Sequence, residues 1–131
     1  MHLHNHQLVG IGSDGDKAAV LSLSAELEMN DPAARASFFA AVNTIGSDGD
    51  RAAVLSNVLR KPKLAPETAV AAIDSAMAMG SDGVKASVLL LAVERHASNP
   101  AVRAALEKAL QSVHSDGDYR RVSAALLRQT I

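Results

Sequence analysis

The chain has 131 residues, a mass of 13.6 kDa and a formal net charge of −1 at pH 7. The near-neutral charge and an aromatic content of only 2% argue against a nucleic-acid-binding protein, which needs a basic surface or stacking rings. The absence of cysteine excludes disulfides and thiolate chemistry, and no apolar run reaches the roughly 20 residues that a membrane-spanning helix needs.

Residues 1–11 precede the first complete repeat and are predicted to form an N-terminal tail or a partial cap. This segment lacks the apolar core of a secretory signal. His2, His4 and His6 alternate along it, so an extended strand would place the three imidazoles on one face as candidate ligands for a transition metal. The alternative is a terminal tail, native or added for expression, whose metal affinity is incidental, because no fourth ligand stands at a suitable spacing.

The tripeptide Ser-Asp-Gly organises the rest of the chain, with its serines at positions 13, 47, 81 and 115, a step of 34 residues each time. A fixed period of this length is typical of stacked repeats, and the Ala- and Leu-rich composition favours helices. We divide residues 12–131, one domain, into repeats 12–45, 46–79 and 80–113 and a half repeat 114–131. The predicted fold is an all-α solenoid of helical hairpins, with about three and a half repeats and seven helices.

Each motif is predicted to begin a first helix, because serine is a preferred N-cap. In three motifs the acid three residues later matches a capping box, whereas Val84 replaces this acid in the third repeat. Aspartates in the first turn are also favoured by the helix dipole. Second helices are expected to begin at Pro32, Pro66 and Pro100, and Gly46 is expected to end one in a left-handed conformation. The capping motif comprises Ser13, Asp14, Gly15, Asp16, Ser47, Asp48, Gly49, Asp50, Ser81, Asp82, Gly83, Ser115, Asp116, Gly117 and Asp118.

The repeated motif also predicts a row of charge along one edge of the stack. The first aspartates of the motifs form this row: Asp14, Asp48, Asp82 and Asp116. A basic residue follows in three repeats and is expected to neutralise the edge in part. One interpretation is repeated cap chemistry with exposed charge, and the other is a mildly acidic rim that receives a basic peptide. With the basic turn of the second repeat, the candidate partner surface comprises Lys17, Arg51, Lys85, Arg60, Lys61 and Lys63.

Catalytic and ion-binding patterns are not evident in the sequence. An EF-hand loop counted from Asp14 would place Ala18 at position 5 and Ala25 at position 12, where calcium needs oxygen ligands. Beyond the tail, His96 and His114 are the only histidines, and neither has an acid and a serine at an informative spacing. There is no zinc helix, phosphate loop or dinucleotide fingerprint. We therefore expect neither an enzyme nor a cofactor.

The string from Ile45 to Leu55, read across the repeats as Ile/Met-Gly-Ser-Asp-Gly-Asp-Lys/Arg-Ala-Ala-Val-Leu, resembles the helical repeats of bacterial HEAT-like proteins. It is especially similar to Ser-Asp-x-Asp-Lys-x-x-Val-Leu repeats in the extracytoplasmic part of some membrane zinc metallopeptidases related to the β-lactam sensor. The resemblance covers about residues 12–131 and the repeat region alone, because this sequence lacks the zinc motif and membrane helices of those peptidases. It implies a sensing or protein-binding role and carries over no catalytic residue.

The tetratricopeptide repeat has the same 34-residue period, but its pattern of Trp, Gly, Tyr and Phe does not match these units. It therefore ranks second as a family. The compartment stays open between the bacterial cytoplasm and, if the chain is a fragment of an exported protein, the periplasm.

The sequence thus predicts a non-enzymatic scaffold that binds a protein or peptide partner, because solenoids present extended surfaces. The alternatives are a purely structural spacer or oligomerisation module, and a small-ligand-binding or enzymatic domain with a deep polar pocket. The last helix carries Arg120, Arg121 and Arg128 and is polar enough to cap the stack. Residues 1–11 are a weak cover for the first helix, so we expect self-association through the N-terminal end, for example as a homodimer.

Overall fold

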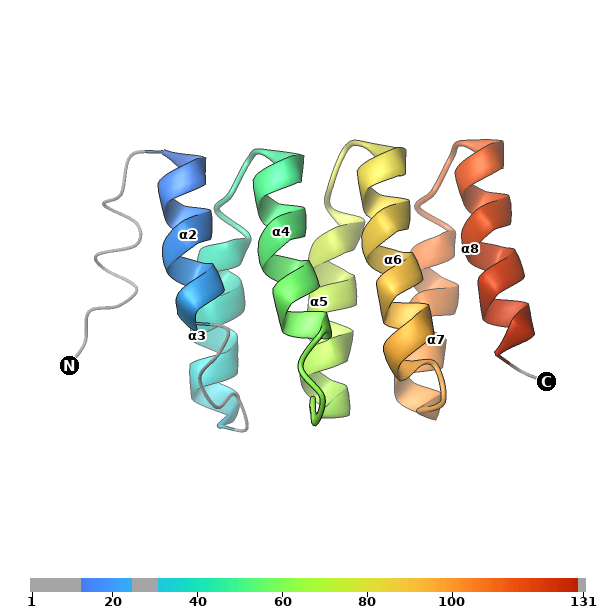
Figure 1. Ribbon diagram of the computed structural model, residues 1–131, viewed down its shortest axis with the longest axis horizontal. Coiled ribbons are helices and arrows are strands. Elements are labelled where there is room, and N and C mark those ends of the chain that lie inside the picture. The colour runs from blue at the N-terminus through green and yellow to red at the C-terminus, as the bar shows by residue number, and fades with distance from the viewer. Residues whose placement is uncertain (1–12, 25–30, 130–131) are drawn as a thin grey trace.

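A computed structural model describes residues 13–24 and 31–129 of the protein (Figure 1). These residues form seven α-helices and no strand: α2 (Asp14–Ser24), α3 (Pro32–Val42), α4 (Asp48–Leu59), α5 (Pro66–Met77), α6 (Asp82–His96), α7 (Pro100–Leu110) and α8 (Asp116–Arg128). The all-α class and the seven predicted helix starts are confirmed. None of these helices is both long enough and apolar enough to cross a membrane.

The helices form two layers, as expected for an α-solenoid (Figure 1). The first helices of the repeats, α2, α4, α6 and α8, stand side by side in one layer, and the second helices, α3, α5 and α7, stand in the other. Each first helix runs opposite to the second helix that follows it. Residues at the same position of successive repeats are therefore placed in successive units along the stack.

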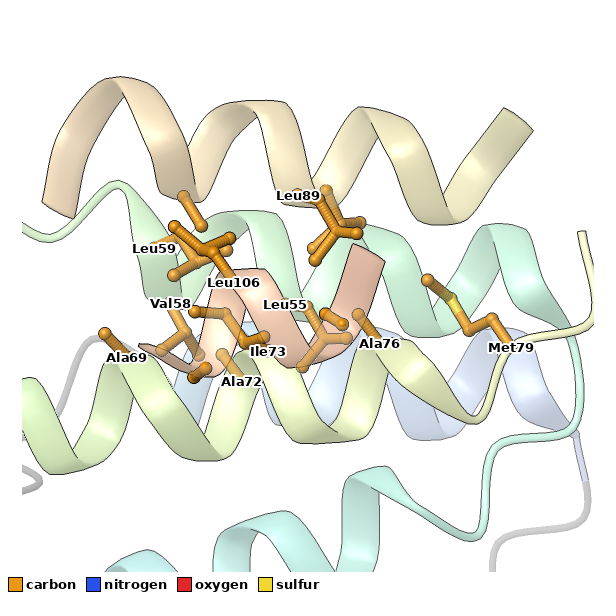
Figure 2. Close-up of a cluster of buried hydrophobic side chains, with 14 of the residues drawn as sticks. Leu55, Val58, Leu59, Ala69, Ala72, Ile73, Ala76, Met79, Leu89 and Leu106 are labelled. Atoms are coloured by element: carbon orange, nitrogen blue, oxygen red, sulfur yellow. The ribbon is translucent and has the colours of Figure 1, made fainter. Parts of the chain in front are cut away.

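The core lies between the two layers and repeats with the sequence period. Leu21, Leu55 and Leu89 occupy the same position in α2, α4 and α6, and all three are buried. Figure 2 shows the middle of this core, where side groups of α4, α5, α6 and α7 meet around Leu55 and Ile73. Full burial of one such residue contributes about 1.5–3 kcal/mol, so each added repeat extends a continuous apolar centre.

The second helices begin with proline at the first helical position, as the sequence predicts. Asp31 caps α3 by accepting a hydrogen bond from the backbone of Ala34, and Asn99 caps α7 in a similar way. Ala65 stands at the equivalent place before α5 and provides no hydrogen-bonding cap. The proline, present in all three repeats, is therefore the common signal for this turn.

The second helices do not end in the left-handed conformation that we expected of Gly46. No glycine in the described part of the protein has a positive φ. Instead, Asn43 closes α3 in a right-handed conformation, and the backbone tightens so that the N–H of Ile45 donates to the carbonyl of Val42. His114 replaces the glycine at the start of the last half repeat, which is consistent with a position that imposes no left-handed backbone.

The two ends of the stack differ. At the C-terminal end, α8 carries Arg120 and Ser123 where α6 carries the buried Ala86 and Leu89, and it therefore presents a largely polar outer face. Leu127 and Tyr119 are the large apolar residues exposed on this helix, 65% and 38% respectively.

At the other end, Val20 of α2 is 37% exposed, whereas the valines at the same position of α4, α6 and α8 are buried. Residues 1–11 lie outside the described residues. Self-association through the N-terminal end therefore stays a prediction.

Candidate partner surface between α3 and α5

The four motif serines occupy the N-cap positions of the first helices. Ser13 accepts a hydrogen bond at Oγ from the backbone N–H of Asp16 at 3.0 Å, and Ser47 accepts one from Asp50 at 3.3 Å. Ser81 and Ser115 accept equivalent bonds at 3.3 and 3.5 Å. Each serine therefore satisfies one of the free N–H groups at the start of its helix.

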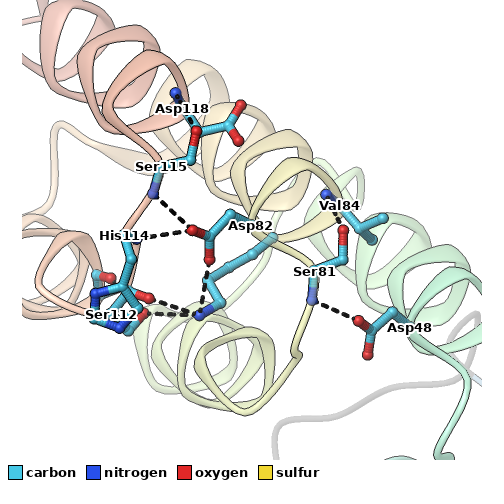
Figure 3. A network of polar contacts seen from close by, with 10 residues as sticks. Asp48, Ser81, Asp82, Val84, Ser112, His114, Ser115 and Asp118 are labelled. Carbon is cyan, nitrogen blue, oxygen red and sulfur yellow. Dashed lines mark hydrogen bonds and ion pairs between the residues drawn. The ribbon is translucent and has the colours of Figure 1, made fainter.

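The first aspartate of each of the first three motifs reaches across to the next repeat, as Figure 3 shows for Asp48 and Asp82. Asp14 accepts hydrogen bonds from the backbone N–H groups of Gly46 at 3.1 Å and Ser47 at 2.8 Å. Asp48 accepts one from Ser81 at 2.7 Å. We name this recurring contact the aspartate latch; its third copy joins Asp82 to His114 and Ser115.

The aspartate latch corrects the predicted capping box. The box required the acid three residues after the serine, present in every motif except that of Ser81, to accept the N–H of that serine. For Ser47, Ser81 and Ser115, that N–H is instead donated to the aspartate of the preceding repeat. The first aspartates are therefore links between repeats, a role that was missed because the partners are 33 residues apart in the sequence.

In the third copy of the aspartate latch, the hydrogen bonds also change the pKa of the aspartate carboxyl group. The backbone N–H of Ser115 lowers the pKa of Asp82, because a hydrogen bond donated to the carboxylate favours its charged form. Partial burial opposes this effect, and the N–H of His114 and the ammonium group of Lys85 add to it. The Lys85 nitrogen lies 3.9 Å from the carboxylate.

The expectation that Arg51 and Lys85 form an exposed partner surface is wrong. Only 9% of Arg51 and 4% of Lys85 are exposed. Arg51 donates to the backbone carbonyls of Ile45, Asn43 and Ser75 at 2.8–3.2 Å. These carbonyls lie at or just beyond the C-terminal ends of α3 and α5, where the helix dipoles favour a positive charge.

The basic residue at the Arg51 position makes different hydrogen bonds depending on whether it is lysine or arginine. Lys85 donates to the carbonyl of Ser112 at 2.9 Å and also to its hydroxyl, and Lys17 lies 3.5 Å from the hydroxyl of Thr44. In the second repeat the corresponding residue is Ala78, which has no hydroxyl. There Arg51 replaces lysine, and its longer fork bridges the first and second repeats.

The basic turn of the second repeat lies at the other end of α4. Arg60 and Lys63 are exposed, and Lys61 is half-buried. Arg60 follows Arg51 by nine residues, which corresponds to about 14 Å along a helix axis. The six basic residues grouped as a partner surface therefore do not form one patch, and the turn is a separate feature.

A surface depression of about 440 Å³ opens between α3 and α5, beside the start of α4. Its lining combines an apolar part, a hydrogen-bonded polar pair and two charges. Ser75 donates its hydroxyl to the amide oxygen of Asn43 at 2.6 Å. The lining residues are Phe39, Asn43, Arg51, Ala71, Asp74, Ser75 and Ala78.

The polar lining does not recur in the other repeats. Asp74 corresponds to an alanine in the first repeat and to a lysine in the third, and Ser75 corresponds to alanine in both. Asn43 corresponds to methionine and then to glutamine. The residues that build the stack do recur, so the depression holds a combination of residues that the repeat plan does not require.

Metal binding has no support in the described part of the protein, where no three His, Cys, Asp or Glu residues converge on one point. His96 lies against the carbonyl of Leu59, with its Nε2 at 2.7 Å from that oxygen. The candidate metal ligands His2, His4 and His6 lie outside the described residues.

Comparisons of the sequence and structure with protein-family models, with curated proteins and with solved structures find no match. The resemblance to bacterial HEAT-like repeats therefore stays a prediction.

Proposed function

We propose that the protein is a non-enzymatic repeat scaffold that binds a segment of a polypeptide partner in the depression between α3 and α5. The observation that carries this proposal is the clustering of non-recurring polar residues in one depression of a regular frame. Asp74 and Ser75 lie in α5, and Asn43 is the C-cap residue of α3, so successive repeats hold all three in place through the same core positions. Groups held on helices keep a defined geometry for recognition.

The form of the depression favours a polypeptide over an enclosed small molecule. Asn43, Asp74 and Ala78 are exposed, so the depression is open along the surface. The amide nitrogen of Asn43 keeps its N–H donors available, since the contact with Ser75 uses the amide oxygen. A donor beside an acceptor carboxylate suits the backbone carbonyl and N–H groups of an extended segment.

Selection from a displayed random peptide library tests this proposal. The immobilised protein should enrich peptides whose binding is lost in Ala78→Trp, because Ala78 lines the depression and a large ring there would fill it. Ala104→Trp is the matched control, since it adds the same ring at an exposed site of α7. Both variants should keep the helical far-UV spectrum of the parent protein.

Failure to enrich any peptide, or equal loss of binding in both variants, would contradict the proposal. The former result would favour the structural spacer or oligomerisation module. Turnover of a small molecule by the purified protein would favour the enzymatic alternative. Expression in the source organism and recovery of a partner that depends on Ala78 would extend the result to a natural polypeptide.

A further inference from the structure

The two charges that line the depression are not equivalent. Arg51 has five N–H donors, and its guanidinium makes four hydrogen bonds to three backbone carbonyl oxygens. The carbonyl ends of α3 and α5 thus compensate its charge. Asp74 is exposed, and no residue in the described ranges pairs with it or donates to it. The charge left to recognise a ligand is therefore negative.

The remainder of the lining suits a long residue with a charged end. Phe39, Ala71 and Ala78 supply apolar surface beside Asp74. Lysine and arginine bury their methylene stems along apolar surface while the charged group stays near water. A lysine or arginine of a ligand can therefore lie across the apolar lining and reach the carboxylate of Asp74.

The surroundings of the depression also favour a cation. Asp50, which directly precedes Arg51, and Asp48, which accepts the N–H of Ser81, stand in the first turn of α4 outside the lining, and both are partly accessible. Because Arg51 turns inward to backbone carbonyls, it forms no ion pair with a carboxylate in the described part of the protein. A positively charged segment is thus attracted toward this part of the edge.

We propose that the depression between α3 and α5 binds an arginine or lysine residue of a basic peptide, with Asp74 as its ion-pair partner. This inference rests on the proposed function and specifies the chemistry of the partner. Asn43 holds the adjoining peptide group, and the apolar lining holds the methylene stem. Arg51 keeps the ends of α3 and α5 in place and does not itself bind the ligand.

Chemical-shift titration of the ¹⁵N-labelled protein provides the test, with three blocked pentapeptides that differ only in the central residue: AARAA, AAQAA and AAEAA. The backbone amides of Asn43 and Ser75 and the terminal amide group of Asn43 report on the depression. AARAA should shift these signals saturably and AAEAA should not. Asp74→Asn should raise the dissociation constant of AARAA about threefold to fivefold, the size expected of an accessible ion pair.

Glu67→Gln is the matched control, because it removes one exposed carboxylate from the same helix at the end far from the depression. It should change the dissociation constant less than Asp74→Asn does. Charge reversal in Asp74→Lys should abolish the response to AARAA and produce a response to AAEAA. That gain would be specific to an ion pair and would not follow from a loss of structure.

The outcomes separate this inference from the proposed function. Equal effects of Asp74→Asn and Glu67→Gln, or stronger shifts with AAEAA or AAQAA than with AARAA, would overturn the inference while leaving a peptide site in place. If no pentapeptide shifts the reporting signals at millimolar concentration, the inference fails. The proposed function is judged separately by whether library peptides are lost in Ala78→Trp.

Discussion

Removal of one aspartate latch should weaken the contact between two repeats without disturbing the core. In Asp48→Ala, the backbone N–H of Ser81 loses the carboxylate oxygen that it contacts at 2.7 Å. Asp116→Ala is the control, because Asp116 has the same place at the start of α8 but accepts no hydrogen bond from a described residue. Both variants lose an acid from the first turn of a helix, so their difference isolates the latch.

The size of this difference follows from the two contributions. Loss of a first-turn acid costs about 0.3–1 kcal/mol at a helix N-terminus and applies to both variants. Loss of the acceptor for a free helix-start N–H costs about 0.5–2 kcal/mol and applies to Asp48→Ala alone. Because water can reach the Ser81 contact, we expect a difference in unfolding free energy of about 1 kcal/mol between the variants.

Urea denaturation followed by far-UV circular dichroism measures this difference, and amide hydrogen exchange locates it. The Ser81 amide should lose protection in Asp48→Ala and keep it in Asp116→Ala. Asp48→Asn should lie between Asp48→Ala and the parent protein, because asparagine keeps an acceptor oxygen but removes the charge. Equal destabilisation by the two alanine variants, or unchanged exchange at Ser81, would refute the role assigned to the latch.

Three further variants test other contacts. Ser47→Ala should lower the unfolding free energy by about 1 kcal/mol, and urea curves that overlay those of the parent would count against the cap. Arg51→Lys should destabilise the protein, since one ammonium group cannot reach three carbonyls, and adding Ala78→Ser should recover part of the loss by supplying a hydroxyl, as the third repeat does. A double-mutant cycle without coupling would contradict that pairing. The hydrogen bond from Ser115 lowers the pKa of Asp82, so the stabilisation is present at neutral pH and is lost as the pH falls below about 4. Asp82→Asn should therefore flatten the acid-side decline of the urea midpoint, and a parallel decline would argue against this linkage.

The helix starts could be predicted because their causes are local. A serine followed by one or two acids, or an Asp or Asn followed by proline, satisfies or removes the free N–H groups of the next few residues. Pro66 shows how little of this signal is needed, since α5 begins there after Ala65, which provides no hydrogen-bonding cap. The 34-residue period then predicts that equivalent helices lie side by side, because each repeat buries its apolar face against the next repeat.

The inward orientation of the Arg51 and Lys85 side chains could not be predicted in the same way. Their local sequence is that of a solvated helix start, and their acceptors belong to neighbouring helix ends. Arg51 donates to Ile45 and Asn43, six and eight residues before it across a turn, and to Ser75, 24 residues after it. Lys85 donates to Ser112, 27 residues after it. Burial of each charge depends on carbonyl groups that become available only when the second helices end beside it. A weak signal was present in the sequence, because lysine occurs with Thr44 or Ser112 and arginine occurs with Ala78.

The candidate site was missed for a related reason. Asn43 and Asp74 are 31 positions apart in the sequence, and neither belongs to a motif. Each residue alone has the appearance of an ordinary polar residue near a helix end. Comparison of the repeats with one another would have revealed both as departures from the common pattern, although only the stacking of α3 on α5 shows that the departures share one depression.

Comparison of the repeats with one another therefore separates the residues that build the stack from the residues that line the depression. The latch aspartates, the cap serines and the buried leucines recur because every junction between repeats needs the same contacts. At the Asp74 position, the residue is directed outward and the junction needs no particular type, so alanine, aspartate and lysine all occur there. Charge at such a position contributes little to stacking. The gathering of this charge with Asn43 and Ser75 in one depression is the observation on which the proposed binding of a partner rests.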